Sequence, residues 1–406
     1  MRVTSRRAGR LSTPALVALL LVTVLLAAAC SSPSGPGSSD GTSSDFAAPP
    51  GASAGDLVGD PMPTDAYIAL RRIVDRTVRF RYLSTDPAGG ELVPVSAAVF
   101  VPRGRAPAGG WEILAVGHPT TGTAGNCAPS LYGNLLGTVE LIASLLEQGF
   151  VVVQTDYQGL GTPGPHRYLD PAPAANNIID SVRATRAVVD GTSDRWWGFG
   201  VSQGGHAIFH ANEIADTYGR GLRLQGTVSM SPALDVAPLA DAMAAGTLTP
   251  EQIAFLPLVL TGLKAKHPEL IIDDYVHGPL LEAFGVFLEC NDDAIVQKQA
   301  VVEETRPEDY RPVDDAATDR LRRWLRDVSL PTGRASAPML VAYSDSDDVI
   351  PAPWTAAAID RGCRLGDVIT AIRVRNQPHG ILDIGSAATD WVKAVRSGRR
   401  PPNTCA

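Results

Sequence analysis

The chain has 406 residues, of which 45% are hydrophobic, 6% aromatic and 19% charged, a composition typical of a globular protein and not of a disordered or fibrous one. Its formal charge is −8, and it becomes −12 without residues 1–29, which carry four arginines and no acidic residue. A protein this acidic is not expected to bind nucleic acid, and no run of like charges identifies another charged partner.

Residues 1–29 have the pattern of an export signal, with basic residues before an apolar run that is too short for a stable membrane span. The segment Leu26-Ala27-Ala28-Ala29-Cys30 resembles a bacterial lipobox, in which the cysteine is lipidated and becomes the mature N-terminus. We therefore expect a lipoprotein signal peptide over residues 1–29, and Cys30 as a lipid anchor at the outer face of the bacterial cell membrane. An ordinary signal peptide, cut nearby to give a secreted protein, is the alternative.

Residues 30–55 consist almost entirely of Ser, Gly, Pro, Ala and Asp, and this composition predicts a flexible tether. The remainder exceeds the usual size of a single domain and contains no visible internal repeat. We therefore expect an α/β core in two parts, residues 56–232 and 333–406, interrupted by a helical cap over residues 233–332.

Strand and helix patterns alternate before the predicted cap. Two alternating segments, Thr77–Leu83 and Pro94–Val101, predict an antiparallel pair. Four later segments predict strands of a parallel sheet: Ile113–Val116, Phe150–Thr155, Arg195–Val201 and Leu222–Ser229. Three segments with helical spacing lie between them: Leu131–Gln148, Ala174–Asp190 and Ser202–Tyr218. This order predicts a doubly wound, mostly parallel sheet.

The predicted cap contains no convincing strand. Its helical segments are Leu239–Ala245, Pro250–Leu263, Leu280–Leu288 and Ala316–Val328. After the cap, strands are expected at Pro338–Tyr343 and Val368–Val374, and helices at Trp354–Gly362 and Ile384–Val395. The complete pattern predicts an α/β-hydrolase fold with an inserted helical cap.

The segment Gly200-Val201-Ser202-Gln203-Gly204 follows a predicted strand and opens a predicted helix. This Gly-x-Ser-x-Gly pattern is typical of a nucleophile elbow, because the sharp turn needs small neighbours and lifts the serine oxygen clear of the sheet. The same pattern occurs at residues 37–41 and 51–55, but there it lies in the tether, without a strand or helix beside it. Ser202 is therefore the predicted nucleophile.

A serine nucleophile needs a base and an acid, which follow it along the chain in this fold. His379 lies in the loop after the last predicted strand, where the base belongs. Asp347 lies just past another strand, and we prefer it to Asp345 and Asp348 because an apolar segment follows it as the next helix approaches. The acidic run has a rival interpretation as a calcium loop, but it lacks the glycine and distal glutamate of an EF-hand.

The other histidines are expected to have structural roles. His206 and His210 lie four residues apart on the elbow helix, yet no third zinc ligand has a recognisable spacing. We therefore expect packing roles for both, and neither a metal nor a cofactor. The remaining ones are expected in loops or in the cap: His118, His166, His267 and His277.

An oxyanion hole requires backbone donors beside the nucleophile. Gln203 supplies one donor through its position directly after Ser202. We expect the second from the loop His118-Pro119-Thr120-Thr121-Gly122, with Thr120 or Thr121 as the donor.

The cap stretch from Ile253 to Leu260 is almost continuously apolar. Its residues Phe255, Leu256 and Leu260 are candidates for binding the acyl chain of a substrate. The same stretch is equally suited to form the packing core of the cap, and the sequence leaves both interpretations open.

Over roughly Val78 to Cys405 the chain resembles the secretory lipases of the α/β-hydrolase superfamily, found in fungi and bacteria. The likeness rests on these segments: the Ser202 elbow, the Asp347 and His379 segments, His118–Gly122, Asn126-Cys127-Ala128-Pro129-Ser130 and Asp156-Tyr157-Gln158-Gly159-Leu160-Gly161. It implies hydrolysis of acylglycerols or other carboxylic esters through an acyl-enzyme, with an ester or lipid as the partner and no cofactor. The oligomeric state is not predicted.

Two alternatives to a lipase or esterase stay open. A peptidase or an acyltransferase on the same fold can use the same three residues, since the fold does not choose the leaving group or the acceptor. A lipid-anchored binding protein for hydrophobic ligands is the non-catalytic alternative.

Four cysteines remain once Cys30 is assigned to the lipid, and an even number in an exported chain indicates two disulfides. Three pairings are possible. The resemblance at Cys127 implies a bridge between Cys127 and Cys290, which would tie the cap to the catalytic domain. It leaves Cys363 paired with Cys405, close to the C-terminus.

Overall fold

The structure is a computed structural model that describes residues 46–405. The expected signal peptide, the lipid anchor Cys30 and most of the expected tether lie outside the described residues. The last residue of that segment contacts the core, since the Gly55 N–H donates to the carbonyl of Leu83, and just after it Leu57 forms a bridge with Tyr82.

A nine-stranded mixed sheet forms the centre of the described region, in the order β1-β2-β3-β5-β4-β6-β7-β8-β9. Pairing is antiparallel from β1 through β3 to β5, and parallel from β5 to β9. The strands are β1 (Met62–Pro63), β2 (Val74–Thr85), β3 (Leu92–Pro102), β4 (Trp111–Gly117), β5 (Val151–Thr155), β6 (Thr192–Val201), β7 (Arg223–Met230), β8 (Met339–Ser344) and β9 (Ile369–Val374). The predicted α/β-hydrolase fold class is confirmed.

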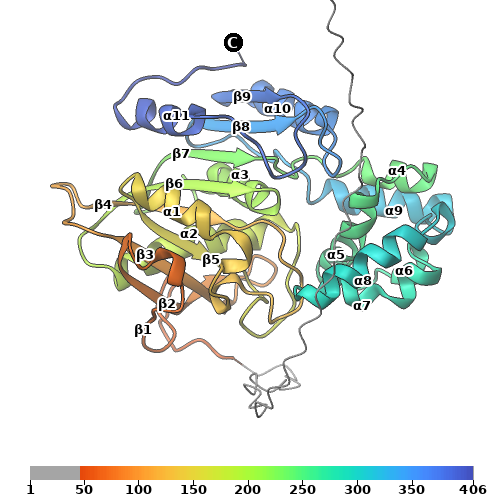
Figure 1. Ribbon diagram of the computed structural model, residues 1–406, viewed down its shortest axis with the longest axis horizontal. Helices are drawn as coiled ribbons and strands as arrows, with labels where there is room; N and C mark the ends of the chain where they lie inside the picture. The colour runs from red at the N-terminus through yellow and green to blue at the C-terminus, as the bar shows by residue number, and fades with distance from the viewer. Residues whose placement is uncertain (1–45, 406) are drawn as a thin grey trace, which may run out of the picture. The chain divides into compact units, whose positions relative to one another are not determined.

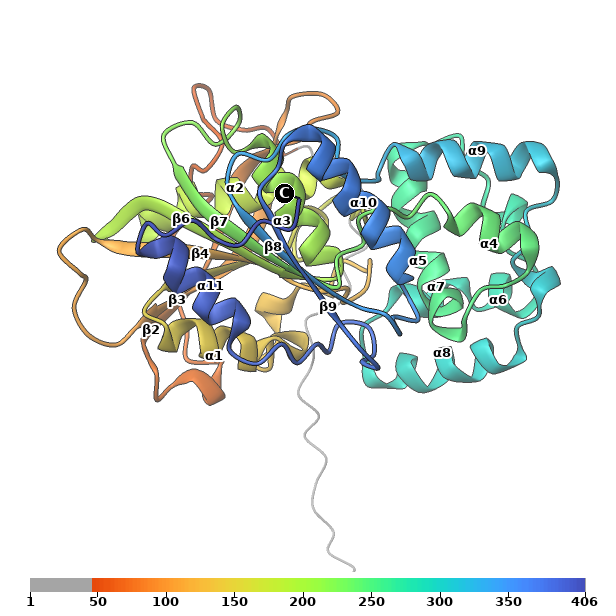
Figure 2. The same ribbon diagram turned by 90° about the horizontal axis from the view of Figure 1, so that it is seen from above.

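Helices cover both faces of the sheet, which explains why β4 and β5 are buried along their whole length. Figure 2 shows α1 and α11 on one face, and α2, α3 and α10 on the other. These helices are α1 (Val139–Glu147), α2 (Pro171–Val188), α3 (Gln203–Ile214), α10 (Ala352–Leu365) and α11 (Ala387–Arg396).

A group of six helices lies between β7 and β8 in the sequence, where the cap is expected. They gather at the end of the sheet toward which β6, β7 and β8 point (Figure 1). They are α4 (Leu239–Ala245), α5 (Pro250–Lys266), α6 (Gly278–Glu282), α7 (Phe284–Leu288), α8 (Asp292–Glu304) and α9 (Asp315–Arg326). These helices share an apolar core with Tyr168, Leu169 and Ile350, and this core is separate from those on the two faces of the sheet.

The longest cap helix, α5, begins where its sequence provides a capping box. The Thr249 hydroxyl accepts from the backbone of Gln252, the Gln252 side chain accepts from the backbone of Thr249, and Pro250 occupies the first turn. Within residues 46–405 no single helix is long and apolar enough to cross a membrane, although α4 and α5 pass that test together as a pair bent by 119°.

Two predicted helical segments differ from the structure, and one helix was not predicted. The segment Leu131–Gln148 begins at the end of a short 3-10 helix, Pro129–Leu131, and contains a second one, Leu135–Gly137, before α1 begins. The segment Leu280–Leu288 is divided at Ala283 into α6 and α7. Helix α8 was not predicted, because two of its apolar residues, Ile295 and Val296, face solvent with exposed fractions of 58% and 71%. Its sequence therefore lacks a one-sided apolar stripe.

Both disulfides implied by the resemblance are present. Cys127 is bonded to Cys290, with 5.6 Å between the Cα atoms, and Cys363 is bonded to Cys405. The first bridge links the loop after β4 to the segment just before α8. The second fixes the C-terminal segment to the end of α10.

Candidate active site

Ser202 occupies a strained turn between β6 and α3, with φ 54° and ψ −117°. The turn brings backbone segments so close together that side chains are excluded at two neighbouring positions. A Cβ atom on Gly204 would lie 1.9 Å from the carbonyl oxygen of Gly117, and one on Gly200 would lie 2.2 Å from the carbonyl oxygen of Gly204. The glycines of the Gly-x-Ser-x-Gly pattern are thus required by this approach, and the turn presents the serine beyond the end of the sheet.

The side chains of Ser202, His379 and Asp347 form a continuous hydrogen-bonded chain. The Ser202 hydroxyl lies 2.8 Å from Nε2 of His379, and Nδ1 of the same ring lies 2.8 Å and 2.9 Å from the two carboxylate oxygens of Asp347. The carboxylate is oriented by two backbone N–H donors, from Val349 at 3.0 Å and Ile350 at 2.8 Å. This is the arrangement that lets an imidazole accept a serine proton.

The neighbouring acid Asp345 has different partners. Its carboxylate accepts from the backbone of Asn376 and from the hydroxyl of Ser346, and it does not contact the imidazole. Within the acidic run, the structure therefore brings Asp347 to His379.

Two buried serines hold the loop that carries His379. The Ser231 hydroxyl accepts from the backbone N–H of Gly380 at 3.2 Å, and the Ser344 hydroxyl accepts from that of Gln377 at 3.3 Å. Ser231 directly follows β7 and Ser344 ends β8, so two strand ends hold the loop on either side of His379. Sequence reasoning missed both serines, because a serine at a strand end is common and its partner is set by the tertiary fold.

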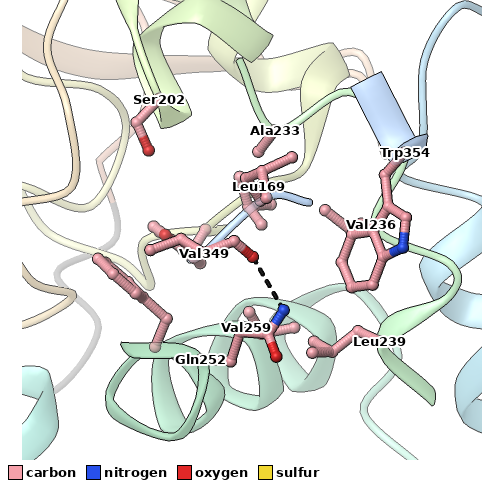
Figure 3. Close-up of a pocket in the computed structure, with 12 residues that line it drawn as sticks. Leu169, Ser202, Ala233, Val236, Leu239, Gln252, Val259, Val349 and Trp354 are labelled. Atoms are coloured by element: carbon pink, nitrogen blue, oxygen red, sulfur yellow. Dashed lines mark hydrogen bonds between the residues drawn. The ribbon is translucent and has the colours of Figure 1, made fainter. Parts of the chain in front are cut away.

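Ser202 opens into a pocket of about 440 Å³, its open mouth included, between the sheet and the cap. Figure 3 shows the serine hydroxyl directed into the pocket from one side, opposite the residues of α5. The lining is predominantly apolar and consists of Tyr168, Leu169, Ser202, Ala233, Val236, Leu239, Gln252, Phe255, Val259, Val349, Ile350 and Trp354. Such a lining suits an acyl chain or another apolar group next to Ser202.

One predicted acyl-binding residue lines this pocket, and two do not. Phe255 lines it, together with Gln252 and Val259, which lie three residues before it and four residues after it on the same face of α5. Leu256 and Leu260 are fully buried in the core of the cap instead. A helix turns about 100° per residue, so these leucines lie on the adjoining face, which fits the alternative interpretation of this stretch as packing core.

The residues predicted for the oxyanion hole lie in two segments that approach each other, since Gly204 touches the end of β4. The Gln203 side chain is buried and its amide nitrogen lies 2.9 Å from Nε2 of His166. The Thr120 hydroxyl lies 2.7 Å from the hydroxyl of Tyr168, whose ring lines the pocket. The Thr121 hydroxyl donates to the carbonyl of Cys127 and so faces the disulfide loop.

The family model of the secretory lipases matches residues 137–401, the greater part of the chain. The chain belongs to the secretory lipase family. It is accordingly a lipase- or esterase-type hydrolase. The candidate site of this secretory lipase lies in the segments that carry the family resemblance. A comparison with curated proteins gave no significant match.

Solved structures of lipases and esterases have the same fold as this secretory lipase. Candida antarctica lipase A in its closed state superposes with a TM-score of 0.68 at 19% identity, over 87% of this chain and 84% of that one. The rice cell wall degrading esterase LipA from Xanthomonas oryzae, in a ligand-bound form, gives 0.63 at 19% identity, over 85% and 95%. A putative hydrolase from Legionella pneumophila gives 0.63 at 18% identity, over 84% and 96%.

The other histidines of this secretory lipase bind backbone carbonyls, carboxylates or aromatic rings. His206 donates to the carbonyl of Val328 at 2.8 Å, and His210 binds the carboxylate of Glu213 at 2.6 Å, so the pair does not share a ligand. Among residues 46–405, no group of three or more His, Cys, Asp or Glu side chains is arranged to hold a metal ion. The other four have these partners: His118 lies beside the carbonyls of Pro119 and Asp156, His166 beside that of Gln158 and His277 beside that of Arg311, and His267 stacks on Trp324.

Three fully buried histidines predict that the protein loses stability in acid. Burial lowers the pKa of His118, His166 and His206 to about 4, so all three rings are neutral in the folded protein at pH 7. In the unfolded chain an imidazole binds its proton near pH 6.5, so the unfolded state takes up more protons as the pH falls from about 6.5 to 4. Each ring then contributes stability above pH 6.5, on the order of 3 kcal/mol, that is lost progressively across that window.

We expect the melting temperature to fall between pH 7 and pH 5, and His206→Gln to reduce that fall. The measurement is thermal unfolding of both proteins at the two pH values. Glutamine can still donate to the Val328 carbonyl but does not titrate. Burial of Asp156 raises the pKa of that carboxyl to about 6, so its protonation adds stability as the pH falls. Because wild type and His206→Gln both contain Asp156, the comparison between them cancels this contribution. An equal fall in wild type and variant would contradict the role assigned to His206.

Proposed function

We propose that this protein is a serine carboxylester hydrolase that cleaves acylglycerols or related acyl esters through an acyl-enzyme. Ser202 attacks the ester carbonyl, while His379 accepts its proton and later delivers it to the leaving alcohol. Asp347 holds the imidazole in the productive tautomer and stabilises its charged form. The backbone N–H groups of Gln203 and of Thr120 or Thr121 stabilise the oxyanion. Water then hydrolyses the acyl-enzyme with the same base.

The observation that carries this proposal is the position of the Ser202 hydroxyl. It lies 2.8 Å from His379, whose other nitrogen binds a buried carboxylate, and it opens into an apolar pocket. A base-activated serine beside an apolar pocket is what an acyl ester requires.

Covalent labelling tests the proposal directly. A fluorophosphonate should react with the folded protein and add its mass to the peptide that contains Ser202, and Ser202→Ala should not be labelled. A nitrophenyl ester series should be hydrolysed by the wild type alone. A wild type that neither labels nor hydrolyses any ester would support the binding-protein alternative.

The acyl chain is expected to occupy the face of α5 that carries Phe255 and Val259. Val259→Trp should therefore shift the preference among nitrophenyl esters toward shorter chains, because the larger ring fills pocket volume. Leu256→Trp is the matched variant one helix face away, where it overpacks the cap core. It should lower the melting temperature at unchanged chain preference, at a cost of about 1–3 kcal/mol. A shift in chain preference in Leu256→Trp, with none in Val259→Trp, would place the acyl chain on the face of α5 that carries Leu256.

The family and the two disulfides indicate an exported protein. Attachment through Cys30, which lies outside the described residues, is the finer proposal. It is supported by the lipobox-like segment and by the tether-like composition that follows it.

A further inference from the structure

One loop contacts Gln203 and Thr120, two of the three candidate donors to the oxyanion. It runs from the end of β5 to the start of α2 and carries His166 and Tyr168. His166 binds the side chain of Gln203, and Tyr168 binds the side chain of Thr120. Since Gln203 follows β6 and Thr120 follows β4, this loop connects the two halves of the expected oxyanion hole.

The contacts of His166 determine the direction of its hydrogen bond with the Gln203 side chain. Its Nδ1 lies 3.0 Å from the carbonyl of Gln158, which only accepts, so Nδ1 carries the proton. In the neutral ring Nε2 is then an acceptor, and the Gln203 amide donates to it. The Oε1 atom of Gln203 has no partner within the described residues, so this bond alone orients the buried side chain.

Tyr157 and Tyr168 hold the other half of the expected oxyanion hole, the loop after β4. Tyr157 and His166 stack with ring centres 5.9 Å apart, and Tyr168 meets His166 edge-on at 6.2 Å. The two outer rings of this row reach the loop after β4: the Tyr157 hydroxyl donates to the carbonyl of His118 at 3.3 Å, and the Tyr168 hydroxyl binds that of Thr120 at 2.7 Å. The loop is therefore held at two points by buried aromatic side chains.

We propose that His166 and Tyr168 are positioning residues of the oxyanion hole, that they act through Gln203 and Thr120, and that Thr120, not Thr121, supplies the second donor. This inference rests on the proposed function, in which Ser202 is the nucleophile. Donors stabilise an oxyanion only within a narrow range of distance. A small displacement of either backbone segment therefore reduces the stabilisation of the transition state, while the pocket that binds the substrate in its ground state is unchanged.

Tyr168→Phe is the principal test, because it removes one hydroxyl and keeps the ring that lines the pocket. We expect kcat for a nitrophenyl ester to fall about tenfold while KM changes by less than about twofold. The affinity for a trifluoromethyl ketone should fall in parallel, because its adduct with serine carries an oxyanion. A merely structural tyrosine would lower the melting temperature and leave the ketone affinity unchanged.

A double-mutant cycle identifies the partner. Thr120→Val removes the hydroxyl that binds Tyr168 and keeps the backbone N–H, and we expect the double variant Thr120→Val/Tyr168→Phe to be no worse than either single variant. Thr121→Val with Tyr168→Phe should give independent effects, because the Thr121 hydroxyl binds Cys127. Coupling of Tyr168 to Thr121 instead of Thr120 would overturn the assignment.

His166→Leu and His206→Leu form a matched pair on the other side. Both histidines are buried and each binds a backbone carbonyl, but only His166 is hydrogen-bonded to the Gln203 side chain. Both substitutions should lower the melting temperature, and only His166→Leu should lower the affinity for the trifluoromethyl ketone.

Failure of the inference and failure of the proposed function give different results. If the wild type shows no Ser202-dependent labelling or turnover, the proposed function fails. If the wild type labels and turns over, but Tyr168→Phe keeps the wild-type kcat and ketone affinity, the inference alone is overturned.

Discussion

Replacement of any member of the Ser202, His379 and Asp347 chain is expected to reduce ester hydrolysis by several orders of magnitude. Ser202→Ala and His379→Ala should each lower kcat by about 10⁴-fold to 10⁶-fold, and Asp347→Asn by about 10³-fold to 10⁴-fold. Asparagine is close to aspartate in shape, but it lacks the charge that stabilises the imidazolium and it favours the wrong tautomer. Because the three side chains act as one unit, a double variant should be little worse than the serine variant alone.

The acidic run provides its own controls for this experiment. Asp345→Asn and Asp348→Asn remove one charge each from the same segment and leave the bond between Asp347 and His379 intact. They should change kcat by less than about tenfold. The measurement is the steady-state hydrolysis of a nitrophenyl ester, with melting temperatures to establish folding. If Asp345→Asn or Asp348→Asn were inactive while Asp347→Asn stayed active, the assignment of Asp347 as the acid would be wrong.

Gly204→Ala is expected to give the second largest loss. The added methyl group would lie 1.9 Å from the carbonyl oxygen and 2.3 Å from the carbonyl carbon of Gly117, and both are rigid backbone atoms at the end of β4. Relief of this contact must move α3 away from β4, and Ser202 and the loop with Thr120 move with them. We expect kcat to fall about 10²-fold, and the free energy of unfolding to fall by about 1–3 kcal/mol.

Gly285→Ala is the matched control for that substitution. Gly285 lies within α7, and a Cβ atom there would meet nothing within 4 Å. The variant should keep full activity and gain up to about 1 kcal/mol of stability, because alanine favours the helix. Steady-state kinetics and thermal unfolding of both variants check the pair. Wild-type activity in a folded Gly204→Ala protein would show that the close approach at the elbow is not needed.

The strands, the cap and the candidate site residues are readable from local patterns. The strands that form the parallel part of the sheet are apolar and short, and the elbow glycines have a geometric requirement that is visible in the sequence. The preference for Asp347 came from the residues after it, Val349 and Ile350, and in the structure their backbone N–H groups both bind its carboxylate. A local turn of this kind is written in a few adjacent residues.

Features that depend on distant segments were not predictable in this way. Helix α5 is apolar around most of its circumference, because one face lines the pocket and the adjoining face packs in the cap core. The sequence therefore offered no polar side by which to tell Phe255 from Leu256. His166 was expected to be an ordinary loop residue, because its contact with Gln203 joins positions 37 residues apart. Helix α8 was missed because two of its apolar residues, Ile295 and Val296, face solvent.

Helix α5 is attached to the catalytic core at both of its ends. At its start the Thr249 hydroxyl binds the carbonyl of Asp348, next to the proposed acid, and the Gln252 amide binds that of Val349 (Figure 3). At its far end Lys266 pairs with the buried carboxylate of Asp170 at 2.8 Å. A hinged lid must swing away as a unit, and α5 can do so only by releasing these bonds. We therefore expect this helix to act as a fixed wall of the pocket beside Ser202 and not as a lid.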